Sequence, residues 1–231
     1  MRVVCVIPAR LESTRLPGKV LLAETGKPLI CHTIEAAQSC KAIDRVIVAT
    51  DSDEVDRVVW DYCDVSRTRP HNCGTDRIAE VAKNFDADLI VALQADEPEI
   101  KPEHIEALVN AYQTIPGCDM ATLATHLDPA DAGNPNVVKV RQSCGFATNF
   151  FRYTGQAFHH LGLYCYSPRF LSWFASQPRT ESEERMSLEQ MRALDNGCRI
   201  RVAIVDHPYH GIDTHGQYDA FVARWKAKHN G

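Results

Sequence analysis

Residues 3–19 read VVCVIPARLESTRLPGK. The apolar run at the start of this segment ends at Pro8. The polar loop after it carries a Pro-Gly turn and three cations, Arg10, Arg15 and Lys19. The amides of a tight turn and fixed positive charges can face the same anion. We therefore predict a short buried strand that leads into a loop able to bind a polyphosphate.

Similar apolar runs recur through the first half of the chain, separated by segments whose apolar residues have helical spacing. The pattern predicts strands at 2–7, 45–50 and 89–93, and helices at 28–40, from about 53, at 74–85 and at 102–113. Continuous apolar strands indicate a sheet that is covered on both faces. The alternation of strand and helix indicates parallel strands joined by right-handed crossovers.

After Pro116 the pattern changes, and short strands follow one another with few helices between them. We expect strands at 120–126, 137–140, 147–151, 161–166 and 199–205, and helices at 181–194 and 218–228. The whole chain, 1–231, is then one α/β domain. It is expected to be Rossmann-like, with a mixed, mainly parallel sheet flanked by helices and a small inserted lobe at roughly 130–185.

The composition argues against several classes of protein. With 25 basic and 30 acidic residues the formal net charge is −5, whereas nonspecific nucleic-acid binding needs a basic face. The apolar runs fall far short of the ~20 residues of a membrane span. The nine cysteines show no C-x-x-C spacing, which argues against zinc or iron–sulfur sites. Since no signal peptide is evident, we expect a cytoplasmic protein that contacts neither nucleic acid nor membrane.

Ligands of such sheets bind beyond the carboxyl ends of the strands, and two further loops there carry carboxylates. The sequence QADEP at 94–98 places Asp96 and Glu97 directly after a buried strand. Adjacent carboxylates suit Mg²⁺, although acidity ahead of the next helix is the alternative. Asp213 follows the last strand; alone it is typical of a helix N-cap, but beside Asp96 it could complete a metal site. Neither a P-loop nor a dinucleotide-binding glycine motif occurs.

The segment HNCGTDR at 71–77 opens a predicted helix, whose first amides favour anions or carbonyl oxygens. Plain capping by Thr75 or Asp76 is the alternative. The second half of the chain supplies polar groups suited to a sugar acid, although each is also typical of an ordinary surface or core position. These residues are Arg152, His160, Tyr164, Glu183, Glu189 and Gln190.

These motifs, in this order, resemble the 3-deoxy-manno-octulosonate (Kdo) cytidylyltransferases, also called CMP-Kdo synthetases. The matching stretches run through nearly the whole chain: IPARLESTRLPGKVL at 7–21, VIVATD at 46–51, HNCGTDRIAEV at 71–81, LQADEPEI at 93–100, NPNVVKV at 134–140, HLGLYCYSPRFL at 160–171, SLEQMRAL at 187–194 and GIDT at 211–214.

The resemblance implies a fold of the nucleotide-diphospho-sugar transferase type and a reaction for lipopolysaccharide synthesis. The anomeric hydroxyl of Kdo attacks the α-phosphorus of CTP, which gives CMP-Kdo and pyrophosphate. By the same resemblance Mg²⁺ is the cofactor and the chain forms a homodimer through the inserted lobe. It implies four groups of site residues: Ala9, Arg10, Ser13, Arg15, Lys19, Gly74, Thr75, Arg77 and Gln94 for CTP; Asp96 and Asp213 for Mg²⁺; Lys19, Arg10, Asp96 and Asp213 for catalysis; Arg152, His160, Tyr164, Glu183 and Gln190 for the sugar acid.

The chain departs from the family pattern at several positions, most of them in the sugar-facing half. Leu11 replaces a tyrosine and Ala95 a glycine, while Phe151 replaces a serine and Met186 a glutamate; the stretch 153–159 is shortened. These changes leave the acceptor open. Kdo is the first expectation; 8-amino-Kdo or another ulosonic acid such as sialic acid is the alternative, and a noncatalytic nucleotide-binding protein is a more distant one.

Overall fold

The computed structural model describes residues 1–13, 15–71 and 73–229, so Thr14 and Asn72, from two of the quoted motifs, lie outside it. Within that part of the chain one sheet of nine strands has the order β3-β2-β1-β4-β8-β5-β9-β7-β6. The strands are β1 (Val3–Ala9), β2 (Arg45–Thr50), β3 (Asp64–Arg67), β4 (Leu89–Ala92), β5 (Met120–His126), β6 (Lys139–Ser143), β7 (Phe146–Phe151), β8 (Phe158–Tyr166) and β9 (Ile200–Ile204).

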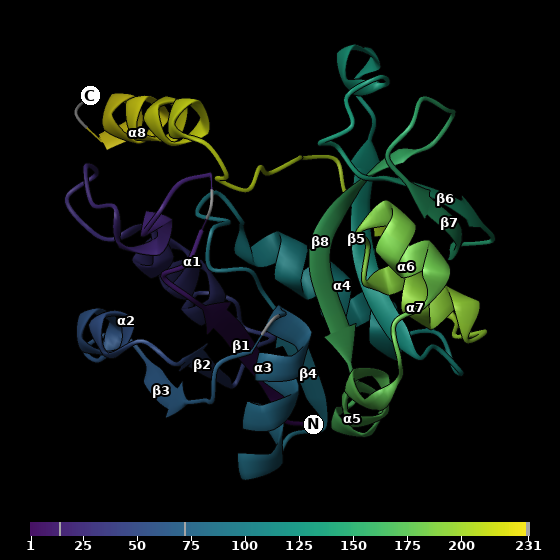
Figure 1. Cartoon of the computed structure of the whole chain (residues 1–231), viewed down its shortest axis with the longest axis horizontal. Helices are drawn as coiled ribbons and strands as arrows, with labels where there is room; N and C mark the ends of the chain where they lie inside the picture. The colour runs from purple at the N-terminus through teal and green to yellow at the C-terminus, as the bar shows by residue number, and fades with distance from the viewer. Residues whose placement is uncertain (14, 72, 230–231) are drawn as a thin grey trace.

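The sheet is mixed, as predicted. The strands β3, β2, β1 and β4 are parallel to one another, and β5 is parallel to β9. The strands β8 and β7 run against their neighbours. The segment 130–185 places β8 between β4 and β5, near the middle of the sheet, and β6 and β7 at its end (Figure 1).

Helices cover both faces of the sheet (Figure 1). They are α1 (Leu29–Gln38), α2 (Asp53–Val59), α3 (Gly74–Val81), α4 (Pro102–Gln113), α5 (Pro168–Ser176), α6 (Glu181–Met186), α7 (Gln190–Asp195) and α8 (His215–His229), with short 3-10 turns η1 (Lys19–Leu21), η2 (Ala82–Asn84) and η3 (Pro129–Asp131). None of these helices, which are those of the described residues, is long and apolar enough to cross a membrane.

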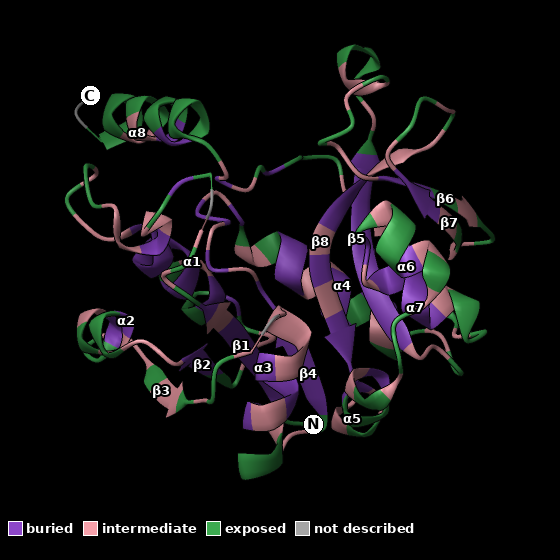
Figure 2. Cartoon of the chain, viewed as in Figure 1, coloured by how far each residue is buried: buried purple, intermediate pink, exposed green. Residues whose placement is uncertain are grey.

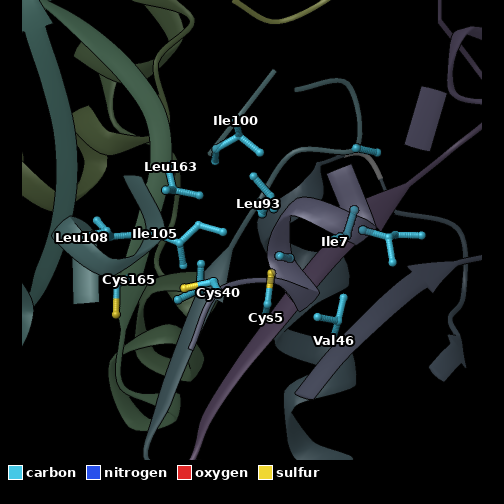
Figure 3. Packing of buried hydrophobic residues seen from close by; sticks show 14 of the residues in the cluster. Cys5, Ile7, Cys40, Val46, Leu93, Ile100, Ile105, Leu108, Leu163 and Cys165 are labelled. Carbon is cyan, nitrogen blue, oxygen red and sulfur yellow. The ribbon is translucent and has the colours of Figure 1, made fainter. Parts of the chain in front are cut away.

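The alternating side chains of β1 belong to two different hydrophobic clusters, one on each face of the sheet. Cys5 and Ile7 pack with residues of α1 and α4, and Figure 3 shows this cluster. Val4 and Val6 pack with residues of α3, α5 and α7. The middle of the sheet is therefore buried on both sides, as the continuous apolar runs predicted (Figure 2).

A third, smaller cluster fixes the loop that follows β1. Leu16 from this loop and Ile212 from the segment after β9 are both buried against Leu29, Tyr218 and Phe221. Gly18 has φ +64°, a conformation that favours glycine, and its amide donates to the carbonyl of Leu11. The cationic loop and the segment that carries Asp213 are thus attached to the same apolar support at one edge of the sheet.

The sequence prediction missed two elements and merged two others. The strand β3 was missed because it is a short, partly exposed edge strand without an apolar run. The helix α5 was also missed, although Ser167 caps it through a hydrogen bond from the Phe170 amide. The predicted helix at 181–194 is two helices, because Ser187 has φ +52° and ends α6.

A buried ion pair joins α6 to α7. The guanidinium of Arg192 donates to both carboxylate oxygens of Glu183, at 2.7 Å from Nε and 2.6 Å from Nη2. Both side chains are almost fully buried. Arg192 Nη1 also donates to the carbonyls of Phe174 and Gln177, which ties α7 to the end of α5.

We expect Glu183→Ala to destabilise the protein by about 3–5 kcal/mol, because it leaves the Arg192 charge buried without its partner. Glu184→Ala changes an exposed glutamate of the same helix and should alter stability by less than about 0.5 kcal/mol. Urea unfolding of both variants measures the difference. Equal midpoints would show that the Glu183–Arg192 pair does not stabilise the fold.

Candidate functional site

The ammonium group of Lys19 joins three loops at the carboxyl edge of the sheet. It forms a hydrogen-bonded ion pair with Asp96, and it donates to Asp213 Oδ1 at 2.9 Å and to the carbonyl of Ile212 at 2.8 Å. Arg15 Nη2 lies 3.0 Å from the same Asp213 oxygen. These contacts bring together the loops after β1 and β4 and the segment before α8.

The charge of Lys19 is stabilised at this position. Burial alone would lower the pKa of the ammonium group, but Asp96 and Asp213 outweigh that effect and raise the pKa above its ordinary value. The lysine is therefore a fixed cation between two carboxylates.

The predicted phosphate-binding residues surround one cavity. Arg10, Ser13, Arg15 and Lys19 line it together with Gln94, Asp96 and Asp213. Three cations in the loop that follows β1 are suited to binding a triphosphate. The structure therefore brings together every residue that the sequence assigned to the phosphates.

The donor set around Lys19 also fits a hard divalent cation. The carboxylates of Asp96 and Asp213 already converge on a single positive charge. Among the described residues no group of three or more His, Cys, Asp or Glu side chains could hold a metal. A pair of carboxylates, completed by phosphate oxygens and water, is the kind of site that Mg²⁺ accepts.

Arg10 also borders a second cavity, between the ends of β1 and β2 and the start of α3. This cavity is lined by Arg10, Leu11, Glu12, Asp51, Ser52, Pro70, His71, Asp76 and Arg77. Arg77 is buried and donates to Thr68 Oγ1 at 2.6 Å, and its Nη1 lies 3.0 Å from Asp51 Oδ1. Ala9 is buried in β1 directly before Arg10.

A third cavity combines residues that the sequence assigned to different ligands. Gly74, Thr75 and Gln94, predicted for CTP, line it beside Tyr164 and Gln190, predicted for the sugar acid. A Cβ atom at Gly74 would lie 3.2 Å from Pro8 Cγ, so glycine lets α3 begin close to the end of β1.

Glu183 does not belong to this site, and its prediction as a sugar ligand was wrong. Both of its carboxylate oxygens are occupied by Arg192. Glu189 lines the cavity instead and accepts a hydrogen bond from Thr75 Oγ1 at 2.5 Å. The two glutamates belong to different helices, because Ser187 ends α6 before α7 begins.

A larger cavity, of about 890 Å³, is lined by Asp96 and Asp213 and also by Arg152 and His160. Arg152 donates to the carbonyls of Met186 and Pro135, at 3.2 and 3.1 Å. Among the described residues it forms no ion pair with a carboxylate, so its charge is available to an anionic ligand. Burial, to which the charges of His159 and Arg152 add, lowers the pKa of His160 to about 3.

Several residues around this cavity were not predicted individually. Asn134 and His210 line it, and the fully buried Lys139 donates from its ammonium group to the Asn134 carbonyl at 2.6 Å. The motif NPNVVKV at 134–140 contains two of them. That motif was the available signal, since a lysine among apolar strand residues is unusual.

Comparison with known proteins identifies the relatives of this chain. The family model "Cytidylyltransferase" matches residues 4–200. The 3-deoxy-manno-octulosonate cytidylyltransferase of Geobacter sulfurreducens is 37% identical over 250 residues, which cover 98% of this chain and all of the relative. The protein of the same name from Syntrophobacter fumaroxidans is 40% identical and covers 96% of each chain.

Solved structures give the same result. A CMP:2-keto-3-deoxy-manno-octonic acid synthetase, solved as a complex with CTP, superposes with a TM-score of 0.94 at 34% identity, over 99% of this chain and all of the other. A 4-diphosphocytidyl-2C-methyl-D-erythritol synthase from Anaerococcus prevotii, over 97% of this chain and 98% of its own, has a TM-score of 0.68 at 13% identity and shares the fold alone. The chain belongs to the 3-deoxy-manno-octulosonate cytidylyltransferase family.

Proposed function

We propose that the chain transfers CMP from CTP to the anomeric hydroxyl of Kdo and releases pyrophosphate, as a step of lipopolysaccharide synthesis. The observation that carries the proposal is the convergence of Lys19, Asp96 and Asp213 between two cavities. One cavity has the cations that a triphosphate needs, and the other has an arginine for a sugar carboxylate. The names of the relatives support CTP and Kdo as the two substrates.

On the nucleotide side, Arg10, Ser13, Arg15 and Lys19 would bind the triphosphate. Phosphoryl transfer depends mainly on in-line positioning and on neutralisation of developing charge. Lys19, which lies deepest of the three cations, is suited to neutralise the α-phosphate as pyrophosphate leaves. The cavity beside Arg77 would receive the nucleoside, since it adjoins the phosphate cavity through Arg10.

We propose Mg²⁺ as the cofactor, held by Asp96 and Asp213. When bound there, Mg²⁺ would neutralise phosphate charge and lower the pKa of the attacking hydroxyl. The two carboxylates would exchange the Lys19 ammonium for the metal, which leaves Lys19 free to contact a phosphate oxygen.

On the acceptor side, Arg152 would pair with the sugar carboxylate. His160, Tyr164 and Gln190 would bind the hydroxyl groups, and Gln94 lies between the acceptor cavities and the phosphate cavity. Gly74 and Thr75 face Tyr164 and Gln190, so we assign them to the boundary between nucleotide and sugar.

The assembly and the compartment are also proposals. We propose a homodimer formed through the segment 130–185, on the basis of the family resemblance. We propose a cytoplasmic location because all nine cysteines, each within the described residues, carry free thiols, as a reducing compartment favours.

The function is tested by pyrophosphate release with CTP, Mg²⁺ and a panel of acceptors. We expect turnover with CTP and Kdo, and none when ATP, GTP or UTP replaces CTP. Turnover only with 8-amino-Kdo or sialic acid would show that the changes at Phe151, Met186 and 153–159 have altered the acceptor. Binding of CTP without turnover on any acid would contradict the proposed reaction.

We expect Asp96→Asn and Asp213→Asn each to lower kcat by about 100-fold or more, because each removes a charge that holds the metal beside the α-phosphate. Asp219→Asn changes an exposed carboxylate of α8 and is the matched control. Steady-state kinetics across a range of Mg²⁺ concentrations measures the effect. A variant with the Mg²⁺ dependence and rate of the control would remove that aspartate from the metal site.

We expect Arg152→Ala to raise the KM for the sugar acid roughly 10- to 100-fold, because it removes a charge-assisted hydrogen bond. The KM for CTP should change little, and Arg169→Ala, at an exposed position of α5, should change neither. Initial rates with each substrate varied in turn separate the two constants. A rise confined to the KM for CTP would contradict the division into nucleotide and acceptor sides.

A further inference from the structure

Thr122 on β5 is fully buried and lies opposite an irregularity of β8. The register pairs Leu123 with Leu161 but Thr122 with Tyr164, so β8 contains two extra residues at this point. The hydroxyl of Thr122 points at the resulting irregular backbone. Its Oγ1 lies 2.9 Å from the Leu163 carbonyl and 3.2 Å from the Leu161 carbonyl.

The same hydroxyl oxygen lies 2.9 Å from His160 Nε2. A threonine hydroxyl has one hydrogen to donate and two lone pairs that accept. Both carbonyl oxygens can only accept, so the hydrogen of Thr122 is directed to them. Oγ1 must then accept from His160, which requires a hydrogen on Nε2.

His160 therefore has a defined tautomer. Its ring is buried, which disfavours a charged imidazolium, so Nδ1 carries a lone pair and no hydrogen. No described residue bonds to Nδ1, and this atom is not among the fully buried unpaired ones. The ring lies on the wall of the cavity that contains Arg152, and it packs against Phe150 in a T-shaped arrangement with ring centroids 5.0 Å apart.

We propose that Thr122 is a positioning residue that fixes His160 as the Nε2–H tautomer, so that Nδ1 accepts a hydrogen bond from a hydroxyl group of the acceptor sugar. The assignment of the sugar rests on the proposed function, whereas the tautomer follows from the geometry of the protein alone. An acceptor atom at this point favours a ligand that offers a hydroxyl, and it excludes the sugar carboxylate from this wall of the cavity. The carboxylate is left to Arg152.

The tautomer is measured first, by the ¹⁵N chemical shifts of the histidine rings in ligand-free protein, with His160→Gln used to assign the signal. We expect hydrogen on Nε2 in the wild type and a mixture of tautomers in Thr122→Val, which keeps the shape but lacks the hydroxyl. Thr122→Ser should restore the wild-type tautomer. Hydrogen on Nδ1 in the wild type would overturn the proposal, and this result does not depend on which reaction the protein performs.

The kinetic consequence is measured with the acceptor that the wild type uses. We expect Thr122→Val to raise the KM for the sugar acid in proportion to the loss of the Nε2–H tautomer, roughly 5- to 10-fold if that tautomer falls to between about a fifth and a tenth of the protein. The KM for CTP should be unchanged, and Thr122→Ser should restore the KM for the sugar acid. Thr125→Val is the matched control, because Thr125 is buried on the same strand and its hydroxyl has no partner among the described residues.

Reduced stability in Thr122→Val with an unchanged KM and an unchanged tautomer would assign Thr122 a structural role only and overturn the proposal. Failure of the proposed function can be distinguished from failure of this proposal. In the first case the wild type turns over no sugar acid, whereas the ¹⁵N shifts still report the tautomer of His160.

Discussion

The site depends on one electrostatic contact, the Lys19 ammonium held between Asp96 and Asp213. Asp96 follows Lys19 by 77 residues, and Asp213 follows Asp96 by 117 residues. The sheet brings the loops that carry them to one edge. Two carboxylates so close together would repel each other without a cation. In this structure Lys19 and Arg15 supply the positive charge, which keeps the edge of the sheet ordered for a polyanionic ligand.

That contact also links binding to the rest of the fold. Leu16, two residues before Gly18, and Ile212, directly before Asp213, share one apolar cluster with α8. The positions of the charged groups therefore depend on the packing of Leu16 and Ile212 against α8. Gln94 and Arg10 each line three of the cavities. Residues from the same loops therefore border both the nucleotide cavities and the acceptor cavities.

Apart from the edge strand β3, the first half of the chain could be predicted from the sequence because its signals are local. The apolar run of β1, the cations after it and the carboxylates after β4 follow one another within short segments, and parallel topology places them at a common edge. The acceptor side was predicted less well. Glu183 and Glu189 are six residues apart in one apparently helical segment. Only their partners in the folded chain, Arg192 for Glu183 and Thr75 for Glu189, show which of the two lines the cavity. The bulge beside Thr122 likewise depends on pairing between strands far apart in the chain.

The role of Lys19, Asp96 and Asp213 is tested most directly by the position of the metal in the complex with nucleotide. Crystals grown with CTP and Mn²⁺ in place of Mg²⁺ would locate the ion by anomalous diffraction. We expect an ion bound by Asp96 and Asp213, with Lys19 Nζ moved from the carboxylates to a phosphate oxygen. An ion bound elsewhere, or Lys19 still paired with both aspartates beside a bound triphosphate, would contradict it.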